Sequence, residues 1–173
     1  MNRRNAVKKL AIASGSLITL PFWMTACTGN EPSTHLSSFS ITEQEILAAV
    51  VDTIIPASDQ IGALSVGVDK YLQRLIDKCY EKDVQDNVKA RLHGLDTAAK
   101  NIYHASFSKC DQQQRQDLVL KVSASQIQNE KDFFNLIKSE TINGFTTSKE
   151  VMITYFHYKL APGHYYGCIN VKT

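Results

Sequence analysis

The sequence lacks the closely spaced residues that metal and cofactor sites commonly use. Its four cysteines, Cys27, Cys79, Cys110 and Cys168, lie far apart, which excludes a zinc cluster built on C-x-x-C pairs and a C-x-x-C-H haem attachment site. The chain also has no glycine-rich dinucleotide or phosphate loop, no H-E-x-x-H and no G-x-S-x-G. We therefore predict no catalytic residue and no bound cofactor for this chain.

Negative charge is absent from the first 30 positions, where no Asp or Glu precedes Glu31. Four of the 19 basic residues fall within the first ten positions, and residues 10–26 are uncharged. A basic start followed by an apolar run is typical of an export signal, which we predict for residues 1–26. A permanent membrane anchor is the alternative, but the 17-residue run contains Pro21 and is shorter than the roughly 20 residues that a span needs.

Removal of such a signal would change the charge balance. The remaining 147 residues carry 15 basic and 17 acidic side chains, a net charge of −2. Since nucleic-acid binding depends on a basic surface, this balance argues against a nucleic-acid partner.

The first residues resemble a twin-arginine motif. Arg3, Arg4 and Lys8 occupy its basic positions, whereas Asn2 and Ala6 replace the usual Ser and Phe. We predict export in the folded state by the Tat route. The alternative is an ordinary Sec signal in which the arginines supply only charge.

The signal ends in Met24-Thr25-Ala26-Cys27, which resembles a lipobox although Met24 stands where Leu is preferred. We predict that Cys27 is lipidated and holds the protein on the periplasmic side of a membrane, because each buried methylene of an acyl chain contributes about 0.8 kcal/mol. In the alternative, Cys27 is simply an apolar residue of the signal helix. Residues 27–40 are polar and rich in Ser, Thr and Pro, and predict a flexible tether.

Apolar residues at helical spacing dominate the rest of the chain, and no alternating strand pattern occurs. A capping box of Thr42 and Glu45 begins the first helix, which ends at Pro56. The further helices are predicted over residues 66–80, from Asp83 to about 107, from Asp111 to 122, over 131–139, and after a second box of Thr147 and Glu150. The sequence therefore predicts one all-α domain over residues 41–173, with five to six orthogonally packed helices.

Three smaller features suggest chemistry only weakly. The carboxylate pairs Glu43 with Glu45 and Asp83 with Asp86 are expected to be exposed caps near helix N-termini. A metal-dependent enzyme that uses His157, His164 and Cys168 stays an alternative hypothesis. In an oxidising compartment Cys110 and Cys168 are a candidate disulfide and Cys79 is expected to be buried, with pairing between molecules as the alternative.

Aromatic residues gather near the C-terminus. Five of them lie between positions 155 and 166: Tyr155, Phe156, Tyr158, Tyr165 and Tyr166. Such a cluster beside Gly and Pro suits an interface. The alternative is a strap that completes the domain's own core.

Two segments carry a resemblance to a known family. VVDTIIPASDQIGALSVGVDKYLQRLI, within residues 46–80, and YFHYKLAPGHYYGC, residues 155–168, resemble the gluconate 2-dehydrogenase subunit 3 family. The resemblance implies a non-catalytic small subunit that binds a large FAD-containing flavoprotein of the glucose-methanol-choline type. That partner oxidises a sugar or sugar acid and passes electrons on, often to a separate cytochrome c. The small subunit is expected to assist folding and Tat export, and Cys27 adds membrane attachment.

The matching segments supply candidate contacts with the large subunit. These are Ile55, Pro56, Gly62 and Ala63 in the loop, and Pro162, Gly163, Tyr165 and Gly167 in the tail. A structural role is the alternative for each of them. For the whole chain, the alternative is a stand-alone envelope lipoprotein that acts as a binding or structural module.

Overall fold

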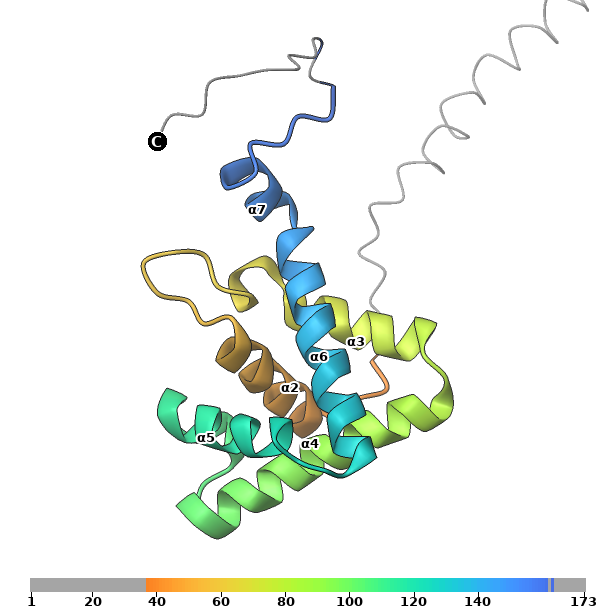
Figure 1. Ribbon diagram of the computed structural model, residues 1–173, viewed down its shortest axis with the longest axis vertical. Helices are drawn as coiled ribbons and strands as arrows, with labels where there is room; N and C mark the ends of the chain where they lie inside the picture. Colours follow the sequence, from red (N-terminus) through yellow and green to blue (C-terminus); the bar gives the residue numbers. More distant parts are fainter. Residues whose placement is uncertain (1–36, 162, 164–173) are drawn as a thin grey trace, which may run out of the picture. The chain divides into compact units, whose positions relative to one another are not determined.

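The structure is a computed structural model that describes residues 37–161 and 163 (Figure 1). These residues form six α-helices and two 3-10 turns, and no strand occurs among them, which confirms the predicted all-α fold. In chain order the elements are α2 (Ile41–Ile54), η2 (Leu64–Val66), α3 (Val68–Cys79), α4 (Lys82–Tyr103), η3 (Phe107–Lys109), α5 (Gln112–Ser123), α6 (Gln128–Thr146) and α7 (Lys149–Thr154). Within the described part of the chain, no helix combines the length and the apolar character that crossing a bilayer requires.

Helix α2 is the central element, because it packs against α3, α4, α5, α6 and η3. Its side chains Ile46, Leu47 and Val51 are fully buried. Around them lie fully buried residues of the neighbouring helices: Leu72, Ile76, Val88, Leu92, Phe107 and Ile137. Helices α4 and α6 also contact each other. Burial of this apolar surface is the main stabilising contribution to the fold.

Helix α2 begins two residues earlier than predicted. The capping box is formed by Ser40 and Glu43, not by Thr42 and Glu45. Ser40 Oγ accepts from the Glu43 N–H at 3.3 Å, and the Glu43 carboxylate accepts from the Ser40 N–H at 2.7 Å. The sequence contains both S-x-x-E and T-x-x-E at this point. The first is used because Phe39, directly before Ser40, is buried in the core.

The other helix ends agree with the sequence to within a few residues. Asp111 caps α5 in a box with Gln114, as expected, whereas Glu81 and Ser148, rather than Asp83 and Thr147, precede α4 and α7. Helix α4 ends at Tyr103 because the next residue, His104, is left-handed at φ 56°. Helix α6 is twice as long as its apolar pattern indicates, because its outer face is polar.

The helical unit begins at Ser37, within the segment that the sequence assigned to the tether. The Ser38 N–H donates to the Asp77 carboxylate at 3.0 Å. Lys89 Nζ donates to the Ser38 carbonyl at 2.9 Å and lies 5.1 Å from the centre of the Phe39 ring. Residues 37–40 are therefore fixed to α3 and α4 by these contacts.

Two buried carboxylates hold helix ends through hydrogen bonds. The sequence predicted that Glu43 is exposed, but it is buried, at 7% exposed. Its carboxylate accepts from His93 Nε2 at 3.1 Å in addition to its capping bond. Asp96 is 5% exposed and accepts from the Ser106 hydroxyl at 2.7 Å and from the Phe107 N–H at 3.0 Å. Burial alone would raise the pKa of each group, but the bonds donated to them, together with nearby basic side chains, lower both values.

Candidate partner-binding surface

The loop between α2 and α3 is closed by backbone hydrogen bonds at its two ends. Pro56 ends α2, because the residue before a proline is disfavoured in the helical region, and Ile55 is accordingly non-helical, at φ −132° and ψ 83°. The Ala63 N–H donates to the Ile55 carbonyl at 3.1 Å, so the first and last residues of the loop lie next to each other. The residues between, Pro56 to Gln60, are exposed.

Gly62 and Ala63 shape this loop and are buried within it. A Cβ atom on Gly62 would lie 2.5 Å from the Ala57 nitrogen, so only glycine allows the chain to pass here. Ala63 is fully buried. Neither offers a side chain to a partner, which corrects their assignment as contacts. Ile55 is half-buried against the core, and Pro56 alone of the four is exposed.

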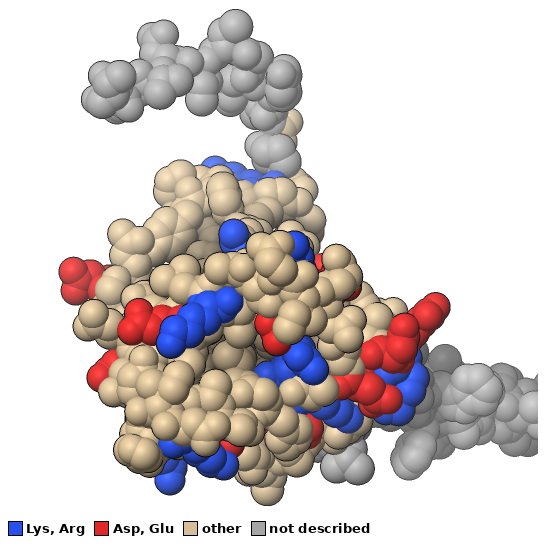
Figure 2. Space-filling model, turned by 60° about the horizontal axis from the view of Figure 1, so that its bottom comes forward, with Lys and Arg blue, Asp and Glu red and all other residues tan. Residues whose placement is uncertain are grey.

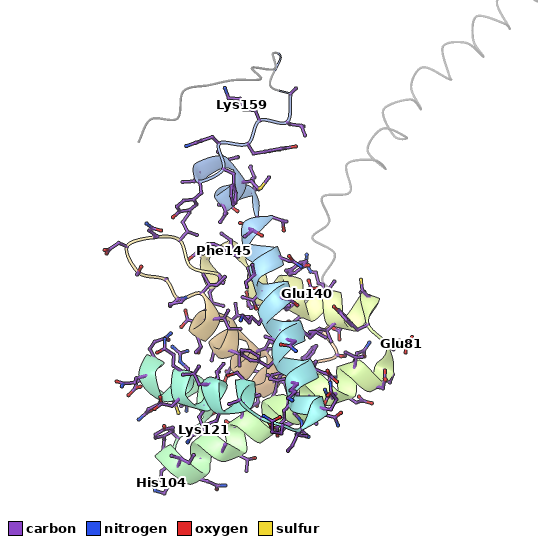
Figure 3. The ribbon with its side chains drawn as sticks, in the orientation of Figure 1. Glu81, His104, Lys121, Glu140, Phe145 and Lys159 are labelled. Carbon is purple, nitrogen blue, oxygen red and sulfur yellow. The ribbon has the colours of Figure 1, made fainter. Side chains whose placement is uncertain are left out.

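Helix α7 brings the aromatic segment back beside this loop. Ser148 Oγ accepts from the Val151 N–H at 3.4 Å and starts the helix, and Val151 is 2% exposed and anchors it. The chain then turns back on itself, since the Tyr158 N–H donates to the Met152 carbonyl at 2.9 Å and His157 is left-handed at φ 49°. Figure 3 shows the segment beyond α7, where Lys159 lies, and Phe145 at the level of the loop.

A hollow of about 220 Å³ lies between the loop and this segment. Tyr155 Oη donates to Gln60 Oε1 at 3.5 Å, which joins positions 95 residues apart in the sequence. The remaining walls are Ile61, Phe145, Thr146, Val151 and Phe156. The structure thus places the loop and the start of the tail, which the sequence predicted separately, around one hollow.

A second hollow, of about 340 Å³, is formed by α2, α5 and α6. It is lined by Thr53, Ile54, Gln116, Val119, Leu120, Phe134 and Lys138. Its one charged group, Lys138 Nζ, lies 5.7 Å from the centre of the Phe134 ring. Ile54, which precedes the loop, lines this second hollow, and Gln60 and Ile61, at the end of the loop, line the first.

Several apolar side chains around these hollows are exposed. Phe156 is 60% exposed, Leu120 63%, Tyr158 51% and Tyr155 43%. Ile153 and Leu160 are also exposed. Tyr155 and Phe156 line the same hollow, and a contiguous apolar surface on a folded domain typically marks an interaction site. For the described half of the aromatic segment, this exposure favours the interface interpretation over a strap that completes the core.

Charge does not single out a site on the face of the molecule that Figure 2 shows. On the face shown in Figure 2, acidic and basic side chains lie beside one another, and no field of one sign covers it. A hollow of about 420 Å³ between α4 and α6 contains Asp83 and Asp132. Two of its polar side chains have partners within the domain, since Gln128 donates to Asp132 at 2.7 Å and Asn87 donates to the Asn129 carbonyl at 3.0 Å.

No group of three His, Cys, Asp or Glu side chains suited to a metal ion occurs in the described part of the chain. His157 is exposed, while His164 and Cys168 lie outside that part. Cys79 is exposed, which corrects its predicted burial. Cys110 is buried as a free thiol, and its pKa is raised by burial and by Asp111, against the opposing charge of Arg115.

The other predicted site residues stay predictions. Outside the described residues lie the export motif, Arg3, Arg4 and Lys8, and the lipidation residue Cys27. The same holds for the tail positions Pro162, Tyr165 and Gly167 and for the Cys168 half of the candidate disulfide. Gly163 is described, and it is exposed with φ 77°.

Sequence reasoning missed Leu120 as a surface residue. Leu120 follows Leu118 and Val119, which are both buried. Successive helical residues are about 100° apart, so three in a row cannot all face the core. That spacing was the available signal, but only the packing of α5 on α2 decides which of the three is exposed.

The described residues form a small helical domain with exposed apolar side chains in and near the two hollows at the ends of one loop. The family model for gluconate 2-dehydrogenase subunit 3 matches residues 41–163, which contain all six described helices. The chain belongs to the gluconate 2-dehydrogenase subunit 3 family, and is thus an accessory subunit of a dehydrogenase complex. No curated protein matches the chain, and no solved structure matches it.

Proposed function

We propose that this chain is the non-catalytic small subunit of an exported, FAD-dependent dehydrogenase of the glucose-methanol-choline type that acts on a sugar or sugar acid. The chain assists the folding and export of the catalytic flavoprotein and attaches it to the membrane. The observation that carries the proposal is the family match over the whole helical domain. FAD belongs to the partner in this proposal, and a cytochrome c is the proposed electron acceptor.

The N-terminal residues support the export and anchoring parts of the proposal. Their basic start, uncharged stretch and terminal Cys27 have the order of a lipoprotein signal. The twin arginines at positions 3 and 4 favour the Tat route, which carries folded proteins. A subunit that binds its partner before export can therefore carry a partner that has no signal of its own.

Co-purification from the native host tests the subunit function. The full-length chain is expressed with a C-terminal tag, the envelope is solubilised gently, and the visible spectrum and the masses of the purified species are recorded. We expect a flavin spectrum and a second, larger polypeptide. A colourless single species that carries only lipid would refute the proposal and support the stand-alone lipoprotein.

Two variants test export and anchoring separately. Replacing both Arg3 and Arg4 by Lys keeps the charge, so a Tat substrate should accumulate as an unprocessed precursor whereas a Sec substrate should still be processed. Cys27→Ser should abolish incorporation of labelled fatty acid and move the complex from the membrane to the soluble envelope fraction. Unchanged labelling and fractionation of Cys27→Ser would refute lipid anchoring but leave the subunit function intact.

A further inference from the structure

We infer that the flavoprotein subunit docks on the loop Pro56–Ile61 and inserts apolar side chains into the two hollows at its ends. This inference rests on the proposed function, which supplies the partner. We call the loop, the two hollows and residues 153–160 the docking surface. One hollow is lined by α2, α5 and α6 and the other by the loop, α6 and α7, so α6 contributes to both.

The amount of exposed apolar area supports this choice. Taking about 200 Å² for an aromatic side chain, the exposed fractions of Tyr155, Phe156 and Tyr158 correspond to on the order of 300 Å². This value is already at the lower bound of the largest apolar patch on a typical monomer, about 300–600 Å². Leu120, Ile153 and Leu160 add to it, toward the roughly 800 Å² that each partner buries in a stable complex.

The charge pattern of the docking surface is that of an interface centre. The hollow beside α7 has no charged lining residue, and the other hollow has only Lys138 at its edge. The loop contributes one acidic residue, Asp59, and residues 153–160 contribute one basic residue, Lys159. Interface cores are depleted of charge and enriched in aromatic residues, so a partner with apolar anchors fits this surface better than a charged one.

Rigid support under the surface lowers the cost of binding. The Ala63 to Ile55 backbone bond and the close approach of Gly62 to Ala57 fix the loop from inside. The Tyr155 to Gln60 bond joins the loop to the aromatic segment across the hollow. Because these residues are already held in place, little binding free energy is lost in ordering them when a partner binds.

The sequence that follows favours a partner subunit over a second copy of this chain. Residues 164–173 come after the docking surface in the sequence and include Tyr165 and Tyr166. Further aromatic residues next in the sequence suit one large partner. The chain's own C-terminal residues and a second copy are therefore the occupants that the experiment must separate from the flavoprotein.

Charge-insertion variants test the surface in the full-length chain. Leu120→Asp and Phe156→Asp each place a carboxylate at one of the two hollows. Ile41→Asp and Ile102→Asp are matched controls, since Ile41 is 78% and Ile102 48% exposed and neither lines either hollow. Far-UV circular dichroism and the unfolding midpoint confirm that each variant folds.

We expect Leu120→Asp and Phe156→Asp each to lower the flavin co-purified per mole of chain at least tenfold, with the controls within twofold of the unaltered chain. No loss in the surface variants, or an equal loss in the controls, would overturn the inference. If the unaltered chain itself brings down no flavoprotein, the proposed function fails and the inference fails with it.

Photo-crosslinking identifies what covers the surface. A benzophenone amino acid at position 156, in the purified complex, should form adducts with the flavoprotein subunit, while the same group at position 41 should not. Adducts with a second copy of this chain, or with residues 164–173 of the same chain, would overturn the inference even where the complex itself is intact.

Discussion

Replacing each of two helical glycines by alanine should change the free energy of unfolding in opposite directions. Gly94 in α4 has open space around the position of a Cβ atom. Gly144 in α6 faces α3, where a Cβ would lie 2.7 Å from Cδ1 of Tyr71 and 3.3 Å from Cγ1 of Val68. Because alanine is the better helix former by about 1 kcal/mol, the two replacements differ only in what the new methyl group meets.

The expected sizes follow from this difference. Gly94→Ala should raise the free energy of unfolding by about 1 kcal/mol, or on the order of 4 °C in Tm. Gly144→Ala gains the same propensity but forces the Tyr71 ring aside, and overpacking costs typically 1–3 kcal/mol. We expect a net loss of about 1 kcal/mol, and a gap of about 2 kcal/mol between the two variants.

Urea unfolding followed by circular dichroism at 222 nm measures both values. A third variant makes the test specific, because Tyr71→Ala removes the ring that Gly144→Ala displaces. In the Tyr71→Ala background, Gly144→Ala should become neutral or stabilising. If Gly144→Ala is as stable as Gly94→Ala in the unaltered chain, then Gly144 and Tyr71 do not pack as closely as described.

Three further predictions concern the loop, a buried carboxylate and the thiols. Gly62→Ala should cost about 1–3 kcal/mol in urea unfolding and lower the yield of flavoprotein, since its Cβ meets backbone that no rotamer change can move; unchanged values would contradict the loop packing. The pKa of Asp96 is lowered in the folded protein, so its ionised carboxylate stabilises the fold. This contribution is fully present above the ordinary aspartate pKa of about 3.9, and it is lost as the pH falls from there through the lowered pKa of the folded protein. Asp96→Asn should lose about 2 kcal/mol at pH 7 and show a shallower loss of stability below pH 4; identical pH profiles would refute this. Iodoacetamide should modify exposed Cys79 in the folded protein and buried Cys110 only after unfolding, and a Cys110 to Cys168 disulfide would additionally require a reductant.

The local features of the fold could be predicted from the sequence. Pro56 ends α2 because it lacks an N–H and restricts Ile55, and Asp111 caps α5 because its side chain accepts from the third residue on. These effects act within a few residues, so the sequence contains all that determines them. Where two capping signals overlap, at Ser40 and Thr42, the burial of Phe39 selects one, and that requires the tertiary structure.

The candidate site divides in the same way. The sequence by itself determined the all-α class, the loop after Pro56, the aromatic segment and the resemblance to the family, because periodicity, proline and short motifs are local properties. Only the tertiary structure decided that Gln60 and Tyr155 meet, that Gly62 and Ala63 are buried, and that Leu120 is exposed and lines one hollow with Ile54. These facts depend on how α2, α5, α6 and α7 pack, and contacts between distant residues are set by the whole core rather than by any one segment.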